Sequence, residues 1–130
     1  MRFLLRTPIP RPAAEVFARF DRSLLERLTP PWMTLKIHRF DGSRKGDKVQ
    51  IEPAMFGILR QSWENEITED GANESGFWFT DEGRKMPFPI RSWRHVHRVD
   101  AAPHGCDIVD DVSFSTGFYP LDLLFLPVVW

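Results

Sequence analysis

The sequence predicts an α+β fold in which short helices cover one face of a curved, seven-stranded antiparallel sheet. Seven short segments alternate apolar and polar residues, a period typical of strands with one inward face. Short turns join most of these segments, and short connections are typical of antiparallel pairing. Helical spacing follows the first segment and returns at the C-terminus. The chain has 130 residues, so residues 1–130 are expected to form a single domain with its own core.

The first strand is expected over residues 2–7, and two short helices should follow it, over 13–20 and 23–28. Apolar residues three and four positions apart mark the first helix as one with a buried stripe. The adjacent prolines Pro30 and Pro31 end the second helix, because proline cannot continue helical hydrogen bonding. Both helices should lie against the inward face of the sheet.

The remaining elements are strands joined by turns, followed by a short C-terminal helix. Residues 41–42 and 70–73 have the composition of turns, and 83–90 contains two prolines and should form an irregular loop. Residues 122–130 are apolar and spaced as a helix, which Pro127 shortens. The six strands are expected over residues 33–40, 46–52, 60–68, 74–81, 91–99 and 107–114.

Composition excludes several classes of protein. The net charge is −1, so no field that attracts nucleic acid is expected. One cysteine excludes an internal disulfide and fits a reducing compartment. Charged residues interrupt the N-terminus too early for a signal peptide, and no apolar run reaches the ~18 residues of a membrane span. A cytoplasmic protein without stable membrane insertion is therefore expected. Eleven Phe and five Trp suit either a core or a cavity for an apolar ligand.

Two consecutive strands carry the polar residues of the inward face. The first places Trp93, His95 and His97 on one side, with arginines on the other. The second places Asp110 on an otherwise apolar side. A hairpin between these strands sets His97 opposite Asp110, within ~5.5 Å at Cβ, so the two are predicted to hydrogen-bond. The predicted register pairs Val99 with Ile108, His97 with Asp110, His95 with Val112 and Trp93 with Phe114.

Five motifs occur in a fixed order: Leu28-Thr29-Pro30-Pro31-Trp32, Met55-Phe56-Gly57-Ile58, Phe79-Thr80-Asp81-Glu82, residues 91–98 and Asp110-Asp111-Val112. Together they resemble the START-like helix-grip (SRPBCC) superfamily, and within it a bacterial branch of small members. The resemblance runs from the first strand to Trp130 and implies a helix-grip fold, in which a curved seven-stranded sheet grips a C-terminal helix around a cavity. Two departures are the loop after Asp81 and a C-terminal helix shorter than the family's.

The function expected from these residues and from the resemblance is the binding of a small apolar or amphipathic molecule in a cavity between the sheet and the helices. One alternative is a polyketide cyclase or dehydratase-like enzyme that uses His97 and Asp110 as an acid–base pair, with His95 as a further candidate. A second alternative is a protein-interaction module that uses the apolar turn 55–58. The predicted ligand-binding residues are Trp63, Phe77, Phe79, Asp81, Trp93, His95, His97, Asp110 and Phe114.

Two histidines and a carboxylate are also the ligand set of some metal sites. Residues two apart on a strand are ~6.5–7 Å apart at Cα, so His95 and His97 would share a metal only if their rings converged. No metal and no cofactor are therefore expected.

The short C-terminal helix is expected to leave part of the inward face uncovered, with Trp63, Phe79 and Trp93 facing solvent. Two explanations stay open: a homodimer through the C-terminal segment, or a longer natural chain.

Overall fold

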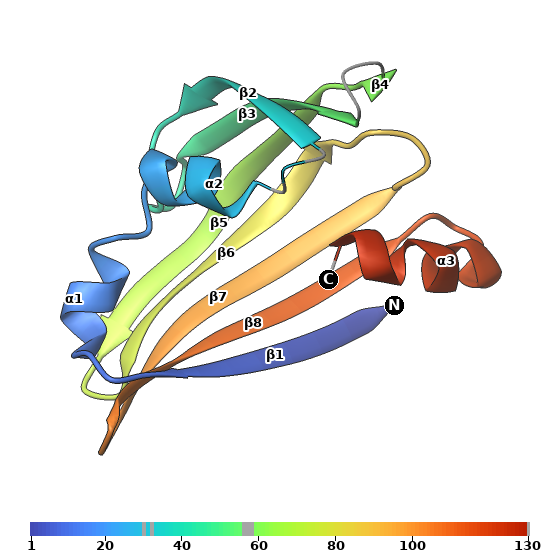
Figure 1. Cartoon of the computed structure of the whole chain (residues 1–130). Helices are drawn as coiled ribbons and strands as arrows, with labels where there is room; N and C mark the ends of the chain where they lie inside the picture. Colours follow the sequence, from blue (N-terminus) through green and yellow to red (C-terminus); the bar gives the residue numbers. More distant parts are fainter. Residues whose placement is uncertain (30, 32, 56–58, 130) are drawn as a thin grey trace.

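A strongly curled antiparallel sheet frames the molecule (Figure 1). The structure is a computed structural model that describes residues 1–29, 31, 33–55 and 59–129. The strands lie side by side in the order β1-β8-β7-β6-β5-β3-β2, and the two-residue β4 pairs with β3, which confirms the predicted seven-stranded sheet. The strands are β1 (Arg2–Ile9), β2 (Met33–Phe40), β3 (Lys48–Met55), β4 (Leu59–Arg60), β5 (Trp63–Asn73), β6 (Gly76–Lys85), β7 (Ser92–Ala102) and β8 (Gly105–Ser115).

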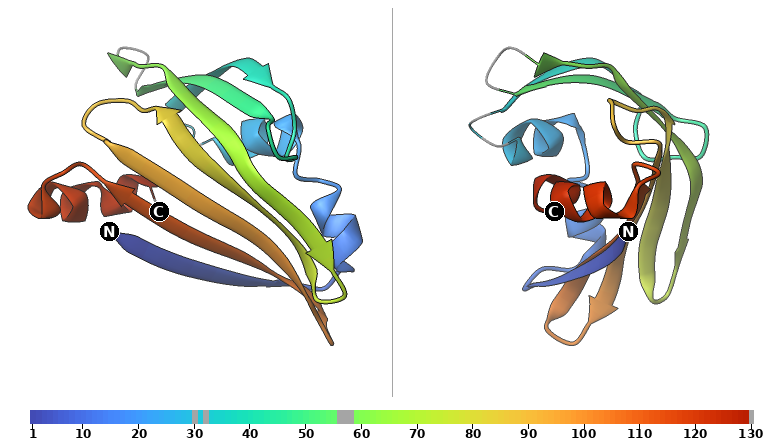
Figure 2. Two further views of the ribbon diagram at one scale, coloured as in Figure 1. Left: turned by 180° about the vertical axis from the view of Figure 1, so that it is seen from behind. Right: turned by 90° about the vertical axis from the view of Figure 1, so that its right-hand side faces the viewer.

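Strands β1 and β2 follow each other in the chain but lie at opposite edges of the sheet. The chain therefore has to cross the concave side, and it does so through α1 (Ala13–Phe17) and α2 (Arg22–Leu28). Figure 2 shows these two helices and α3 (Tyr119–Val129) on the concave side. This connection explains why helical spacing in the sequence interrupts an otherwise all-strand pattern.

The two short helices have different ends from those predicted. Helix α1 stops at Phe17 instead of residue 20, because the amide of Phe20 bonds three residues back, to the carbonyl of Phe17, and the chain then turns. Helix α2 starts at Arg22. The helix was predicted to begin at residue 23, but its N-cap is Asp21, whose carboxylate accepts the Leu24 amide at 2.9 Å. The extended backbone of that cap is what separates the two helices.

The predicted turn over 70–73 is wrong, because those residues belong to β5. Gly71 lies directly beneath the Trp78 ring, so close that a Cβ there would stand 2.2 Å from it. The turn comes later, where the Asn73 side chain accepts the Ser75 amide at 2.8 Å and Gly76 adopts a φ of +141°. Packing of an aromatic ring on a glycine thus overrides local turn chemistry.

Other strand limits also moved. Strand β3 begins two residues later than predicted, and Arg60 belongs to β4 rather than to the strand that starts at Trp63. Strand β6 continues to Lys85 into the predicted loop. Strands β7 and β8 extend until only Pro103 and His104 form their turn.

An aromatic layer under α1 forms part of the core. Phe17 stacks on Phe77 with ring centroids 4.8 Å apart, and Phe20 meets Phe79 edge-on at 6.0 Å. Phe79 is only 6% exposed, so the prediction that it faces solvent is wrong. Helix α1 and the residue Phe20 that follows it therefore cover this end of the sheet.

Helix α3 is tied to the end of β8 by one carboxylate. Asp122 is buried, and its Oδ1 accepts both the amide and the hydroxyl of Thr116 at 2.6 Å. Farther along, Leu123 and Leu124 are 49% and 70% exposed, so Leu124 does not cover the sheet. Among the described residues, no helix is long and apolar enough to cross a membrane.

Candidate functional site

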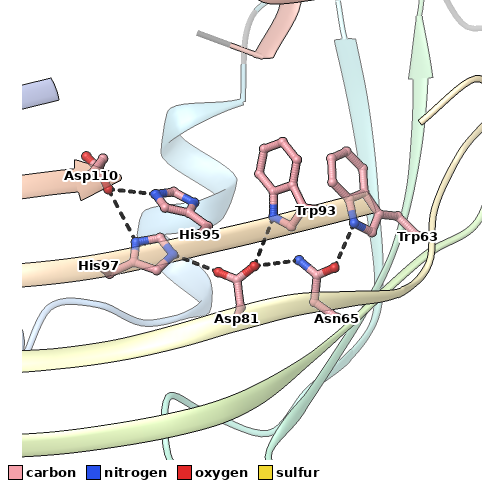
Figure 3. A network of polar contacts seen from close by, with 7 residues as sticks. All are labelled: Trp63, Asn65, Asp81, Trp93, His95, His97 and Asp110. Carbon is pink, nitrogen blue, oxygen red and sulfur yellow. Dashed lines mark hydrogen bonds and ion pairs between the residues drawn. The ribbon is translucent and has the colours of Figure 1, made fainter. Parts of the chain in front are cut away.

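Four neighbouring strands, β5 to β8, direct polar side chains toward one another on the concave face (Figure 3). The register of β7 with β8 is the predicted one, with His97 opposite Asp110 and Val99 opposite Ile108. Strand β6 adds Asp81 opposite His95. We call the connected group the inner network. Its members are Trp63, Asn65, Asp81, Trp93, His95, His97 and Asp110.

Asp81 is the centre of the inner network. Its Oδ1 accepts the Asn65 amide at 2.9 Å and the Trp93 indole N–H at 3.0 Å. Its Oδ2 lies 2.7 Å from Nε2 of His97. Trp63 in turn donates its indole N–H to the carbonyl oxygen of Asn65 at 2.7 Å. Because every contact of this buried carboxylate is with a donor, its position and rotation are fixed from the two neighbouring strands, β5 and β7.

Asp110 contacts both histidines through a single oxygen. Its Oδ1 lies 2.9 Å from Nε2 of His95 and 3.3 Å from Nδ1 of His97. The second contact is an ion-pair distance without hydrogen-bond alignment, and the buried Nδ1 of His97 has no hydrogen-bond partner among the described residues. The predicted hydrogen bond between His97 and Asp110 is therefore wrong, although the register is right. Each ring instead reaches diagonally, His97 to Asp81 and His95 to Asp110, as long side chains in a sheet do.

The two imidazoles converge and are held by aromatic rings. The centroids of His95 and His97 are 3.6 Å apart, with 30° between the ring planes. Phe79 stacks on the other face of the pair, 4.3 Å from the His97 centroid. Trp63 and Trp93 pack perpendicular to each other at 5.0 Å. The polar groups thus lie in an aromatic frame that limits their rotamers.

The environments of the two histidines push their pKa values apart. Burial favours the neutral form of His97, but contacts with Asp110 and Asp81 outweigh it and raise its pKa to about 9. Burial, together with the nearby charge of His97, lowers the pKa of His95. Burial opposes ionisation of Asp110, but its hydrogen bond with His95 and its charge interactions with both histidines bring its pKa well below the usual range. At neutral pH the pair is one imidazolium and one neutral imidazole.

The protons of this arrangement follow from the acceptors. A carboxylate only accepts, so the neutral His95 must carry its proton on Nε2, facing Asp110. The lone pair of His95 is then on Nδ1. The charged His97 donates Nε2–H to Asp81. One ring is therefore arranged as a base or ligand, and its neighbour as a proton donor.

Most of the sequence-predicted site residues lie together in the structure. The inner network includes six of them, and Phe79 stacks against it. Phe77 packs under α1 instead, and Phe114 is buried at 2% exposure. Asn65 was missed, although its alternation with Trp63 and Ile67 already placed it on the inward face. The six are Trp63, Asp81, Trp93, His95, His97 and Asp110.

Of two hollows formed by described residues, neither is lined by the histidines or carboxylates of the inner network. A hollow of about 410 Å³ lies where β1 and β7 begin and β8 ends, and Trp93 and Phe114 line it together with charged residues. A smaller one of about 190 Å³, the helix hollow, lies between α1, α2 and the strands β1 and β8. Its lining residues are Ile9, Arg11, Glu15, Val16, Arg19, Phe20, Leu24 and Ile108.

Two sequence motifs fall partly outside the described residues. These are the proline–tryptophan motif over 28–32 and the apolar turn over 55–58. The prediction that the turn forms a partner contact therefore stays a prediction.

No protein-family model matches the chain, and no curated protein matches its sequence. Its fold is shared with solved structures. Ginseng major latex-like protein 151 from Panax ginseng matches with a TM-score of 0.66 at 14% identity, over 96% of this chain and 90% of that one. Ara h 8.0201 matches with a TM-score of 0.61 at 18% identity, over 90% and 79%. Protein Ms6760 from Mycobacterium smegmatis matches with a TM-score of 0.68 at 14% identity, over 98% and 81%.

At these identities the likeness concerns the fold alone. The chain has the helix-grip fold that the sequence motifs implied: a curled antiparallel sheet with helices on its concave side.

Proposed function

We propose that this chain binds a small amphipathic molecule on the concave side of the sheet, with its apolar part in the helix hollow and its polar group at the inner network. The observation that carries this proposal is the position of Phe20. Its ring lines the helix hollow and also meets the His97 ring edge-on at 6.2 Å. A molecule that fills the hollow therefore contacts an aromatic ring that in turn contacts His97.

The chemistry of the two places supports the same division of the ligand. Val16, Leu24 and Ile108 give the hollow apolar walls, which favour aliphatic or aromatic ligand groups. Ile108 is two residues from Asp110 on the same face of β8. A hydroxyl or carbonyl group of a ligand that reaches from Ile108 to Asp110 would lose its hydrogen bonds with water and gain hydrogen bonds with His95 or Asp110.

Binding is tested with a fluorescent apolar dye and with native mass spectrometry of freshly purified protein. Leu24→Trp should fill the hollow and weaken dye binding at least tenfold. The matched control is Leu4→Trp, since Leu4 is 50% exposed on the outer face of β1, and it should leave the affinity unchanged. Equal dye affinity in both variants, with no co-purified molecule in the spectrum, would reject the proposal.

A second candidate function is acid–base catalysis of the polyketide cyclase or dehydratase type. It is favoured by the different protonation of the two stacked rings. In a dehydration of a β-hydroxy ketone, neutral His95 would take the proton α to the carbonyl and His97 would protonate the leaving hydroxyl. The C–H and C–O bonds break, a C=C bond forms, and water leaves.

This reaction is followed by the ultraviolet absorbance of the enone product. Catalysis predicts turnover by the wild type and its loss in His95→Gln, with dye binding retained. Dye binding without any enone would reject catalysis and leave the binding function standing.

Two further parts of the proposal concern the surroundings of the protein. Association of two copies through α3 is supported by the exposed Leu123 and Leu124. Light scattering should then give twice the mass of one chain for the wild type and the mass of one chain for Leu124→Glu.

A cytoplasmic location is supported by Cys106, a buried free thiol.

A further inference from the structure

We propose that Asp81, His95 and His97 together bind one divalent first-row transition-metal cation. One ligand atom from each of these residues lies within 4.8 Å of the other two. The sequence alone did not predict a metal site, because His95 and His97 are two residues apart on one strand and their rings need not converge. In the structure they do meet, with centroids 3.6 Å apart.

Asp110 prepares both histidines for such a role. It contacts Nε2 of His95 at 2.9 Å and Nδ1 of His97 at 3.3 Å. Two nitrogens remain for a cation: Nδ1 of His95, which carries a lone pair, and Nε2 of His97, which would have to release its proton when the metal binds. A carboxylate on the far nitrogen of each ligating histidine is the usual support of metal sites, because it fixes the ring and strengthens the ligand.

Asp81 is prepared in the same way. Asn65 and Trp93 both donate to its Oδ1, so Oδ2 alone is directed toward the histidines. That oxygen is now 2.7 Å from Nε2 of His97. Two ligands of a tetrahedral cation, each at about 2.0–2.1 Å, stand roughly 3.3 Å apart. The contact would have to open by less than about 1 Å, a small side-chain movement.

The charges of the inner network also favour a cation. It contains two carboxylates, and among the described residues no lysine or arginine contacts either of them. Two imidazole nitrogens and one carboxylate oxygen suit Zn²⁺, Co²⁺ or Ni²⁺ better than Mg²⁺ or Ca²⁺, which prefer oxygen ligands. Three protein ligands leave a position for water or for an oxygen of a bound molecule.

The experiment uses the full chain, treated with a chelator and then titrated with Zn²⁺ alone by calorimetry and with Co²⁺ by visible absorption. We expect one equivalent of each metal and the intense visible bands of a low-coordinate Co²⁺ site. His95→Gln should weaken Zn²⁺ binding at least a hundredfold, and Asp110→Asn 10- to 100-fold with unchanged stoichiometry. Far-UV circular dichroism establishes that each variant is folded.

The matched control is His104→Gln, because His104 also bonds a carboxylate, that of Asp107 at 2.7 Å, but lies exposed in the turn between β7 and β8. It should bind Zn²⁺ as the wild type does. The inference is overturned if the wild type binds no Zn²⁺, or if folded His95→Gln binds it as tightly as His104→Gln. Dye binding by metal-free protein is measured in parallel, so that failure of the metal site is distinguished from failure of the ligand-binding proposal.

Discussion

Replacement of Asp81 by alanine should destabilise the fold more than any other single change in the inner network. The mutation removes the acceptor of three hydrogen bonds of 2.7–3.0 Å, from Asn65, Trp93 and His97. A buried donor left without an acceptor costs about 1–3 kcal/mol. The three costs are not additive, since they share one site, and the side chain of Asp81 retains 12% exposure, so water replaces part of the loss. We expect a total of about 3–5 kcal/mol.

The comparison is with the other carboxylate of the network. The side chain of Asp110 is 28% exposed and accepts one aligned hydrogen bond, so Asp110→Ala should cost only about 1–2 kcal/mol. Asp111 is the matched control, because it follows Asp110 on β8 but faces outward and pairs with the exposed Arg2. Asp111→Ala should cost no more than about 1 kcal/mol.

Urea unfolding followed by circular dichroism measures these differences, provided that the slope with denaturant is unchanged between variants. Since domains of this kind have a stability of about 5–15 kcal/mol, Asp81→Asn supplies a milder variant that keeps an acceptor oxygen for Asn65 and Trp93. A double-mutant cycle should give a larger coupling energy for His97 with Asp81 than for His97 with Asp110. Equal destabilisation by Asp81→Ala and Asp110→Ala, or the reverse order of couplings, would refute the assignment of Asp81 as the centre.

Two further predictions concern the frame around the site. Gly76→Ala should lower the free energy of unfolding by at least about 2 kcal/mol and so lower the melting temperature. The reason is that Gly76 has a φ of +141° and that a Cβ there would stand 1.9 Å from the Val99 carbonyl oxygen. Gly46→Ala, at a φ of +91° with open space around it, should cost only the backbone strain of about 1–2 kcal/mol, so an equal loss in both variants would contradict the clash. Hydrogen bonds from Thr116 hold the pKa of Asp122 below its usual value, so its stabilisation is present above the unfolded pKa of about 3.9 and is lost as the pH falls through the lower folded value. Thermal melts between pH 2 and 6 should therefore show a steeper acid loss for the wild type than for Asp122→Asn, and parallel curves would contradict this.

The register of β7 with β8 could be predicted from the sequence because these two segments satisfy two conditions. Both segments alternate strictly, and a short connection leaves one pairing that keeps every apolar residue inward. The pairing of Val99 with Ile108 followed from this. The pairing of Asp81 with His95 did not, because a loop with two prolines separates β6 from β7 and leaves their register open. The rotamers of His95 and His97 then decide which carboxylate each ring contacts. The alternation of residues in the sequence predicts directly opposed pairs and does not predict diagonal contacts.

Errors at the element ends have a related cause. Asp70 and Gly71 have the composition of a turn, but the ring of Trp78 covers Gly71 and keeps the segment in β5. The second helix was expected from residue 23, yet Asp21 has the extended backbone and the side chain that cap it. In each position a contact with a distant or neighbouring side chain decided between local alternatives of similar energy.

The position of β1 has a consequence for the order in which the molecule is assembled. Its partner is β8, and Arg2 is separated by 109 residues of sequence from Asp111, to which it is bonded. Of the strands of the sheet, β1 is made first and must remain unpaired until β8, the last strand, has been made, while β2 to β7 already have neighbours available. Closing so long a loop is costly in entropy and slows folding. Two features of β1 discourage it from pairing with another chain while it is exposed. It carries positive charge at Arg2 and Arg6, and it lacks one backbone amide donor at Pro8.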